Sequence, residues 1–535
     1  MHIIRSTLVF YVLLLSGFVV SQDAQRPLGT ELPASPKAPK RVAVIGAGSG
    51  GSSAAYYLRT YADYFSVPIN ITIFERSPHV GGRSTTVNVF DDPSLPIELG
   101  ASIFVEANKN LMKAAKTFGL TIQGAGDGRP KEATDSVGVW DGTKFVFQQR
   151  EGNYRWWNIL QLLWRYGWAP MRTQDLMKST IDKFLKLYQY PLFPWKSLSE
   201  AARSSGLIES TWATGAEFLK ANHISEAFSR EIIQASTRVN YGQNLPLIHG
   251  LETMVCMAAQ GAVSIRGGNW QIFRGMAAAS KAVLNLETEV TNVKRREDNA
   301  YAVSYVTKTN TTEQEAFDHV VLAAPLQFSG IKLGPTINNR PDEIPYVKLY
   351  VTLFSSPHKL SPKYFNLPPN ALVPETVLTT LPKGLDLGHR RDGVGPTGFW
   401  SISTLQKVRP PVKQRVNVPD HYVYKVFSPE PLSTAFLSGI LGIKGPAKGS
   451  ISDFLQSDIS WSHEKLWHSY PVLYPRVTFE EIQLAPNLWY TSGIESLIST
   501  METSSLSGMN VAALMVSQET EDFKPKMNMF DYGLL

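Results

Sequence analysis

The stretch Val42–Gly51, VAVIGAGSGG, followed by SSAAYYL at residues 52–58, decides the fold of this chain. Its β-branched start predicts a buried strand, and the small residues at its end predict a helix. Between them, Gly46, Gly48 and Gly51 have the G-x-G-x-x-G spacing of a loop that wraps its backbone around a dinucleotide pyrophosphate. The first glycine permits the tight turn, and the second lets the phosphates approach. The third lets the helix pack on the strand, with its N-terminus toward the negative charge.

A second strand and an acidic residue follow the glycine loop at a suitable distance. Ile69–Phe74 is rich in β-branched residues, which predicts a strand, and Glu75 comes directly after it. A carboxylate about 20 residues beyond the glycines can accept hydrogen bonds from ribose hydroxyls. The alternative for Glu75 is a solvated carboxylate at a strand end, which the preceding glycine loop makes less favoured. Together these elements predict an α/β fold with a Rossmann-like dinucleotide-binding domain.

A second glycine turn, Gly81-Gly82-Arg83, comes soon after Glu75, and Glu98-Leu-Gly100 follows it. Such a turn lets the backbone pass close to a cofactor, and the Arg83 guanidinium suits a two-pronged contact to phosphate. The alternative for Arg83 is a surface ion pair with Glu75 or Asp91. As a set, these motifs resemble flavoproteins of the glutathione-reductase-like and amine-oxidase-like types. The resemblance implies FAD rather than NAD, with Gly82, Arg83 and Gly100 near it.

Two later segments fit the same resemblance. Leu284–Val293 is similar to the strand and turn at which such flavoproteins place a valine backbone, here Val290, against adenine; an ordinary strand end is the alternative. Leu488–Glu495 precedes a helix-like run, which predicts a strand, a glycine turn and a helix N-terminus that forms a second anion site. The resemblance implies that Gly493 and Glu495 close over the pyrophosphate and ribityl chain.

The length of 535 residues is too great for one compact core, so two domains are expected. A helical pattern dominates residues 105–255, and strand-like alternation with frequent prolines dominates residues 335–480. We predict a discontinuous Rossmann-like FAD-binding domain and a mixed α+β substrate domain. The predicted segments are a signal peptide at 1–21, a linker at 22–40, the FAD-binding domain at 41–110 with 260–335 and 481–520, and the substrate domain at 111–259 with 336–480.

Composition and charge argue against several other classes of protein. A hydrophobic content of 43% with 18% charged residues indicates an ordered globular chain. A net charge of +6 without a dense basic run argues against a nucleic-acid partner. The ten histidines show no metal-ligand spacing, so no metal site is predicted. The single cysteine, Cys256, lies among apolar residues, which predicts a buried thiol and excludes an intrachain disulfide.

The N-terminus has the pattern of a secretory signal. Arg5 precedes the apolar stretch Leu8–Val20, and Ser21 offers a small-residue cleavage site. The chain is therefore expected in the secretory pathway, with a lysosome or vacuole and secretion both open as its destination. An uncleaved anchor is the alternative, so any membrane association is expected to be peripheral or through this segment. Glycosylation sequons begin at Asn70 and Asn310.

Three further stretches have a distinctive composition. Residues 245–265 are fairly apolar but interrupted by charged side chains, which predicts a buried helix and no membrane span. Trp156–Trp168 is aromatic and almost wholly apolar, which predicts either core or the wall of a cavity for a long apolar ligand. Thr237–Asn244 introduces polar side chains into an apolar region, and these must form either a buried network or a ligand site.

Across residues 41–520 the chain resembles the prenylcysteine oxidase family, whose members are also called prenylcysteine lyases. Beyond the glycine loop, the resemblance is carried by Leu163-Trp-Arg-Tyr-Gly167, Arg238-Val-Asn-Tyr-Gly-Gln243, Tyr424-Lys-Val-Phe-Ser428, and Gly493-Ile-Glu495 with Met501-Glu502. Glu98–Ser102 and Arg266–Asn269 depart slightly from the family pattern. Those departures put an identical substrate geometry in doubt but not cofactor binding.

The resemblance implies an FAD-dependent thioether oxidase that acts on farnesyl- or geranylgeranyl-cysteine from degraded prenylated proteins. A hydride leaves the prenyl C1, water adds, and cysteine, a prenyl aldehyde and, with oxygen as acceptor, hydrogen peroxide are formed. This chemistry needs no strong protein base, and we assign no catalytic residue. The charged cysteine end of the substrate needs polar anchors, for which a structural network is the alternative. The candidate anchors are Arg238 with Asn240 and Tyr241, or Arg165 with Tyr166.

Two other functions are open at this point. Another flavin oxidase, for amines or amino acids, or a carotenoid-type desaturase, fits the glycine motifs equally well but not the blocks in the middle of the chain. A non-enzymatic prenyl-binding protein is the second alternative, because the escort and dissociation-inhibitor proteins of small GTPases share this architecture. The secretory signal and the complete set of glycine-loop, Glu75 and Arg83 motifs speak against that alternative.

Overall fold

The computed structural model describes residues 38–124, 136–149, 162–259, 261–335, 337, 339–385, 387–388, 390, 393–411 and 419–520. The chain from Pro39 onward forms one compact unit, to which all elements below belong. The predicted signal peptide at 1–21 and nearly all of the predicted linker at 22–40 lie outside the described residues.

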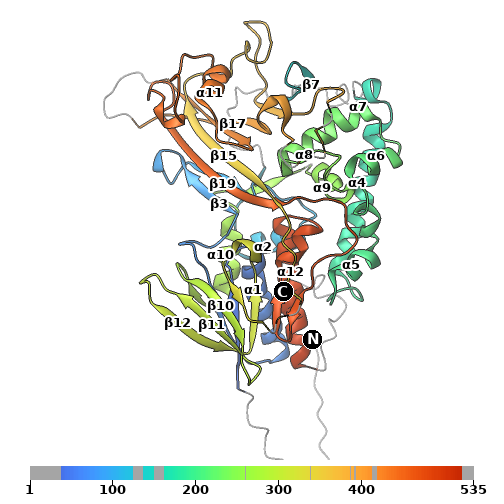
Figure 1. Ribbon diagram of the computed structural model, residues 1–535, viewed down its shortest axis with the longest axis vertical. Coiled ribbons are helices and arrows are strands. Elements are labelled where there is room, and N and C mark those ends of the chain that lie inside the picture. Colours follow the sequence, from blue (N-terminus) through green and yellow to red (C-terminus); the bar gives the residue numbers. More distant parts are fainter. Residues whose placement is uncertain are drawn as a thin grey trace, which may run out of the picture. The chain divides into compact units, whose positions relative to one another are not determined.

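The opening stretch folds as predicted, as a strand, a glycine turn and a helix (Figure 1). Its strand lies within a six-stranded sheet whose neighbouring strands are parallel, except for the antiparallel pair β20–β21. In sheet order the strands are β20 (Gln483–Ala485), β21 (Leu488–Tyr490), β13 (His319–Leu322), β1 (Lys40–Ile45), β2 (Ile69–Phe74) and β9 (Val283–Asn285). The buried faces of β1 and β13 explain their nearly continuous apolar sequences.

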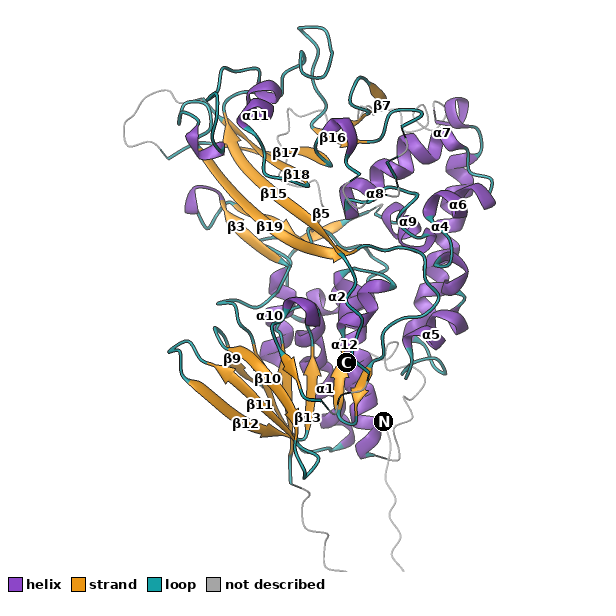
Figure 2. Cartoon of the chain, viewed as in Figure 1, coloured by secondary structure: helices purple, strands orange, loops and turns teal. Residues whose placement is uncertain are grey.

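Helices from distant parts of the chain pack together beside this sheet (Figure 2). They are α1 (Ser49–Phe65), α2 (Lys109–Thr117), α10 (Trp270–Ala279) and α12 (Met501–Glu519). The closest pair is α1 and α12, because small residues line their contact. A Cβ atom on Gly508 would lie 2.2 Å from the Gly50 carbonyl oxygen, and the hydroxyls of Ser53 and Ser505 are 2.7 Å apart. The C-terminal helix is thereby held against the helix that follows the glycine loop.

A four-stranded sheet packs on this half of the molecule. Its order is β12 (Thr312–Phe317), β11 (Tyr301–Val306), β10 (Glu289–Arg295) and β14 (Lys332–Leu333). Val290 and Tyr305 from this sheet share a buried cluster with Phe74 from β2. All strands of the six- and four-stranded sheets come from the three segments assigned above to the FAD-binding domain.

The other half contains a seven-stranded sheet, and five of its strands come from residues 335–480, where strands were expected. Its order is β19 (Trp461–Pro471), β15 (Tyr346–Ser356), β18 (His421–Ser428), β17 (Ser401–Val408), β16 (Thr376–Thr379), β6 (Val137–Trp140) and β7 (Phe145–Gln149). Burial alternates only in part along these strands: the end of β15 and the middle of β18 are buried on both faces. The helix α11 (Thr434–Leu441) packs on this sheet, where its Leu437 shares a buried apolar cluster with Phe354 of β15 and Tyr424 of β18. Two short antiparallel pairs complete the strands: β3 (Thr85–Asn88) with β4 (Pro96–Gly100), and β5 (Ile122–Gly124) with β8 (Val263–Ile265).

The expectation that residues 105–255 are mostly helical is wrong for part of that range, because β5, β6 and β7 are strands. The physical reason is packing across the sheet. Gly138 in β6 lies so close to Phe145 and Pro374 that an added Cβ would be 2.6–2.7 Å from their side chains. Contacts with neighbouring strands therefore decide that this β-branched and aromatic segment forms a strand.

Most of the described remainder of that range is helical. The helices are α4 (Ala169–Leu185), α5 (Leu198–Ser205), α6 (Gly215–Ala221), α7 (Glu226–Phe228), α8 (Gln234–Tyr241) and α9 (Gly250–Met257). Of these, α8 lies beside β16 (Figure 2). The buried helix predicted at 245–265 is confirmed only over α9, because Val263–Ile265 is the strand β8. Cys256 on α9 is buried as predicted. In the part of the chain that the structure describes, no helix has the length and apolar character needed to cross a membrane.

Candidate functional site

Two of the three loop glycines are required by the packing of the protein itself. Gly46 has a positive φ of +105°, and a Cβ there would lie 3.0 Å from the Ala323 carbonyl oxygen. A Cβ on Gly51 would lie only 1.9 Å from the carbonyl oxygen of Gly46. The first turn of α1 therefore presses directly on the loop, as predicted for the third glycine of this motif.

The middle glycine, Gly48, has a different environment. A Cβ there would meet the protein only at ordinary contact distances, 3.8 Å from Gly82 Cα and 4.0 Å from the Gly81 carbonyl oxygen. Packing within the protein therefore does not explain why position 48 lacks a side chain. The open side of Gly48 is a cradle that a side chain would fill, which fits a backbone that approaches a bound phosphate.

Glu75 connects the end of β2 to the glycine loop. Its side chain is buried and accepts a hydrogen bond of 2.8 Å from the Ala47 backbone N–H. The other carboxylate oxygen accepts from the N–H and hydroxyl of Ser77, at 2.9 and 2.7 Å. The alternative of a solvated carboxylate is thus wrong. Because each carboxylate oxygen has further lone pairs, ribose hydroxyls remain possible additional donors.

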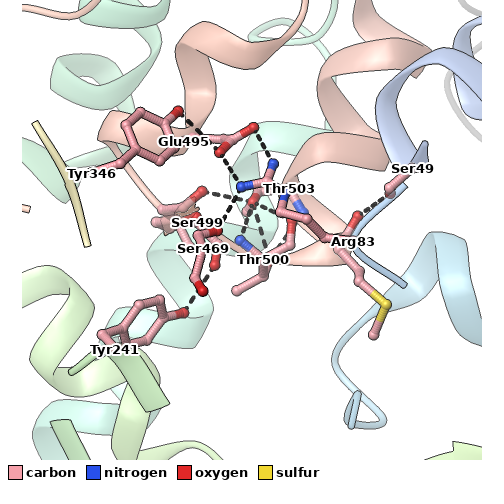
Figure 3. A network of polar contacts seen from close by, with 11 residues as sticks. Ser49, Arg83, Tyr241, Tyr346, Ser469, Glu495, Ser499, Thr500 and Thr503 are labelled. Carbon is pink, nitrogen blue, oxygen red and sulfur yellow. Dashed lines mark hydrogen bonds and ion pairs between the residues drawn. The ribbon is translucent and has the colours of Figure 1, made fainter. Parts of the chain in front are cut away.

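Arg83 forms a two-pronged ion pair with Glu495, at 2.8 and 2.6 Å (Figure 3). The guanidinium also donates to the Ser469 carbonyl oxygen at 2.6 Å, and the Tyr346 hydroxyl donates to Glu495 at 3.2 Å. The proximity of Glu495 holds the pKa of Arg83 above its ordinary value despite burial. The alternative, an ion pair of Arg83 with Glu75 or Asp91, is wrong, because its partner is Glu495. Two residues predicted to lie at the cofactor are therefore joined, from segments 412 residues apart.

The N-termini of α1 and α12 lie side by side next to this pair. The Ser49 hydroxyl at the start of α1 donates to the Met501 carbonyl oxygen at 2.6 Å (Figure 3). Thr500 caps α12 by accepting the Thr503 N–H at 3.1 Å. The dipoles of two helices that begin side by side contribute a positive potential to this region, which favours a bound anion.

The remaining predicted cofactor residues lie on segments that border the same region. The chain from Asn285 to Thr288, just before Val290, hydrogen-bonds the Glu75 backbone on both sides, each bond at 2.9 Å. A Cβ on Gly100 would lie 2.9 Å from the Arg83 carbonyl oxygen, so glycine lets β4 pass close to the second glycine turn. Gly493 lies in the 3₁₀ turn Ser492–Ser496 that carries Glu495. The contact of these residues with a cofactor remains a prediction.

Sequence reasoning missed a buried pair that lies beside Gly100. The Lys425 ammonium on β18 donates to the Glu98 carbonyl oxygen at 2.6 Å and to the Ser102 hydroxyl at 3.1 Å. The Glu98 carboxylate accepts the Asn269 N–H at 2.6 Å. Burial raises the pKa of Glu98 to about 7 and lowers that of Lys425 to about 8. The available signal was a lysine inside the alternating pattern of a strand otherwise rich in aromatic and β-branched residues.

The two candidate sets of substrate anchors occupy different places. Arg165 donates to Glu231 at 2.7 Å, and the Tyr166 hydroxyl donates to the same carboxylate at 2.8 Å. Tyr241 instead donates to the Ser499 carbonyl oxygen at 3.0 Å, which ties the end of α8 to the start of α12 (Figure 3). Asn240 donates to the Ser236 carbonyl oxygen one turn earlier. Only Tyr241 is thereby connected to the region around Glu495.

Arg238 is wholly buried and bonded on all sides. It makes five hydrogen bonds, which match the five N–H donors of a guanidinium, and it stacks 4.7 Å above the Trp400 ring. The acceptors are the Thr379 hydroxyl, the Asn244 amide oxygen, the Gly393 and Val394 carbonyl oxygens and the Thr397 hydroxyl. Burial lowers the pKa of Arg238 to about 9. These contacts favour the structural-network alternative, while a substrate contact remains a prediction.

We expect Arg238→Ala to lower the free energy of unfolding by about 3 kcal/mol, because it strands several buried acceptors at once. Chemical denaturation of the variant checks this. A variant of unchanged stability with a raised KM would contradict the network and assign Arg238 to the substrate.

Three buried carboxyls predict that stability falls as pH rises. Burial raises the pKa of Glu98 and Glu502 to about 7 and of Glu252 to about 8, from an ordinary value of 4.5. Between pH 6.5 and 8 the folded chain therefore holds protons that the unfolded chain has released, so stability is present at the acid end and is lost toward pH 8. Two groups act in the opposite sense: Lys425, with its pKa lowered to about 8, does so only near pH 8, and His249, with its pKa lowered to about 4, only below pH 6.5. The three carboxyls outweigh them between pH 6.5 and 8.

Each such proton corresponds to about 1.4 kcal/mol per pH unit. We expect a lower Tm at pH 8 than at pH 6.5, and a smaller difference in Glu252→Gln, which cannot titrate. A Tm that is flat or rises across this window would contradict the expectation.

The fold and the glycine cradle define a two-domain α/β protein with a Rossmann-like dinucleotide-binding half. The family model of an NAD(P)-binding Rossmann-like domain matches residues 44–118. A solved structure of a putrescine oxidase variant covers 90% of this chain and 99% of its own, with a TM-score of 0.53 at 13% identity. At that identity the likeness shows a shared fold.

The family model of prenylcysteine lyase matches residues 149–529, so the chain belongs to the prenylcysteine lyase family. The farnesylcysteine lyase of Arabidopsis thaliana is 29% identical over 498 residues, which span 90% of this chain and 89% of that protein. Prenylcysteine oxidase 1 of Mus musculus is 29% identical over 506 residues, or 91% of each chain. The family resemblance stated from the sequence is thereby confirmed.

Proposed function

We propose that this chain is an FAD-dependent thioether oxidase that cleaves farnesyl- or geranylgeranyl-cysteine. Its relatives are named for the cleavage or oxidation of such compounds. The observation that carries the cofactor assignment is the cradle at Gly48, which faces the second glycine turn and is bordered by Glu75 and two helix N-termini. These residues fit a dinucleotide whose pyrophosphate approaches the loop backbone.

The overall reaction converts the thioether, water and oxygen into cysteine, a prenyl aldehyde and hydrogen peroxide. The C1–H and C1–S bonds of the prenyl group break, and a carbonyl C=O bond forms from the oxygen atom of water. When bound, the flavin supplies the two-electron acceptor and passes the electrons to oxygen. The task of the chain is therefore to bind and orient both partners and to control the protons nearby.

The described residues suit these tasks. Glu75 and the glycine loop would hold the ribose and pyrophosphate, while the Arg83–Glu495 pair fixes the late 3₁₀ turn against the second glycine turn. Lys425 and Glu98 hold the end of β4 next to Gly100. Because Glu98 has its pKa raised to about 7, its carboxyl can hold a proton near neutral pH. None of these groups is required as a strong base.

The choice of FAD over NAD rests on the second glycine turn and on the late segment around Glu495, which the resemblance places at a flavin. The test is the absorption spectrum of the purified full chain. We expect a yellow protein with the two broad bands of an oxidised flavin, released as FAD on denaturation. A colourless protein that binds NADH would contradict the assignment.

The two alternative functions, another flavin oxidase and a non-enzymatic prenyl-binding protein, predict different results with farnesylcysteine. Hydrogen peroxide should form with farnesylcysteine and not with amines or amino acids, which separates the proposal from another flavin oxidase. Binding of a prenylated peptide by a protein without flavin would favour the escort-type alternative. The family membership favours neither of these alternatives.

The secretory signal, the lysosomal or secreted destination and the glycans belong to the same proposal. Asn310 is exposed in the turn between β11 and β12, and Asn70 is exposed on β2. An exposed turn is accessible to glycosylation, so Asn310 is the favoured acceptor. A mobility shift on enzymatic deglycosylation, lost in Asn310→Gln, tests this.

A further inference from the structure

The aromatic stretch that ends at Trp168 is only partly core where the structure describes it, because Tyr166 is buried but the tryptophans are exposed. Trp164 is 91% exposed and Trp168 is 69% exposed, and Met171 in the first turn of α4 is 42% exposed. The expectation of core is therefore wrong for these side chains. Trp164, Trp168 and Met171 form what we call the tryptophan corner, at the start of α4.

The tryptophan corner is a fixed structure. Gly167 has a φ of +60° and donates its N–H to the Leu163 carbonyl oxygen at 2.8 Å, which closes one helical turn before α4 begins. Tyr166, which lies between the two tryptophans in the sequence, is buried. Its hydroxyl donates a hydrogen bond to Glu231, and its ring packs edge-on against Phe228 with 5.2 Å between the ring centres. The corner is thus anchored from beneath, while its two indoles project into solvent.

Two basic side chains lie on the same segment as the corner. Residues 162–174 contain Arg165 and Arg172 and no acidic residue, and an exposed acidic residue, Asp175, follows directly on α4. Both arginines are exposed, and Arg172 is oriented by a hydrogen bond of 2.8 Å to the His223 carbonyl oxygen. Arg165 shares Glu231 with Arg230, so this carboxylate does not neutralise both guanidinium groups.

We propose that the tryptophan corner docks the enzyme on the surface of an anionic phospholipid bilayer. Indole rings favour the water–hydrocarbon interface, a methionine adapts to irregular apolar surroundings, and guanidinium groups bind lipid phosphates. Three side chains expose only a few hundred Å², whereas a stable protein partner needs about 800 Å² on each side. An interface of this size suits shallow insertion into lipid.

The reason for such docking rests on the proposed function. A farnesyl or geranylgeranyl chain partitions into membranes, since each buried CH₂ contributes about 0.8 kcal/mol. An enzyme that cleaves such a compound gains access to it at the membrane surface. Docking itself is a property of the surface and can be measured without turnover.

The test is sedimentation of the full chain with phosphatidylcholine vesicles that contain or lack phosphatidylserine. We expect binding that is stronger with phosphatidylserine, and about tenfold weaker binding of the double variant Trp164→Glu/Trp168→Glu. Arg172→Gln should lose about fivefold of the binding to phosphatidylserine vesicles. The matched control is Trp212→Glu, because Trp212 is 64% exposed outside the corner, and it should bind like the unaltered chain.

Three results would overturn docking: no binding to either vesicle, a double variant that binds like the unaltered chain, or a double variant that converts an oligomer into a monomer. Should the glutamate variant fail to fold, Trp164→Phe/Trp168→Phe offers a second measurement. Lipids brominated on their acyl chains should quench the fluorescence of the unaltered chain and quench this variant less; equal quenching contradicts the proposal. A protein that binds vesicles but releases no peroxide from farnesylcysteine would contradict the proposed function and leave docking intact.

Discussion

Gly48→Val is expected to leave the chain folded and to remove its dinucleotide. A Cβ at this position meets no protein atom closer than 3.8 Å, so we expect the apoprotein to tolerate the substitution. The same atoms would occupy the cradle between the loop and the second glycine turn, where the pyrophosphate is placed. We expect affinity for FAD to fall by far more than tenfold, which corresponds to a loss of more than about 1.4 kcal/mol.

The measurement is the flavin-to-protein ratio of the purified variant, with circular dichroism to check folding. Gly334→Ala is a suitable control, since a Cβ there meets only ordinary contacts on a strand remote from the loop, the nearest at 3.5 Å. Full flavin content in Gly48→Val would place the pyrophosphate elsewhere.

Gly51→Ala should have the opposite pattern, with loss of the fold and not of a ligand contact. Its Cβ would lie 1.9 Å from the Gly46 carbonyl oxygen and 3.1 Å from the Ala323 side chain. Neither the loop nor the buried first turn of α1 can move aside, because α1 is packed against α12. We expect the free energy of unfolding to fall by about 3 kcal/mol or more.

Thermal unfolding of Gly51→Ala with and without added FAD checks this expectation. Saturating cofactor should raise the Tm of the variant and of the unaltered chain and leave the difference between them in place, because the clash is internal to the protein. A variant as stable as the unaltered chain would show that the loop relaxes. Two glycines three residues apart thus separate cofactor binding from folding.

The sequence predicted the local elements around the cofactor, because the glycine loop and the strand before Glu75 depend on short-range geometry. β1, α1 and β2 are confirmed, as is the strand Leu488–Tyr490. The partners of the site residues were not predictable in this way. Arg83 pairs with Glu495 and Lys425 contacts the backbone of Glu98 because strands distant in sequence meet in space.

The sequence also did not predict which side chains are buried where the composition of a segment fits more than one environment. The aromatic stretch that ends at Trp168 left core and a cavity wall open, but Trp164 and Trp168 are exposed to solvent, and their neighbour Tyr166 is buried. In the same way, the polar cluster at 237–244 left a ligand site and a network open, and the five hydrogen bonds of Arg238 favour the network. These outcomes depend on tertiary contacts that a pattern of residue types does not encode.

The central claim is that a flavin held at the Gly48 cradle accepts two electrons from the carbon beside a thioether sulfur. Its most direct test is anaerobic addition of farnesylcysteine to the purified, flavin-loaded chain while the absorption spectrum is recorded. We predict that the long-wavelength flavin band bleaches with one equivalent of substrate and returns, with release of hydrogen peroxide, when oxygen is admitted. A flavin that stays oxidised in the presence of saturating farnesylcysteine would contradict the account.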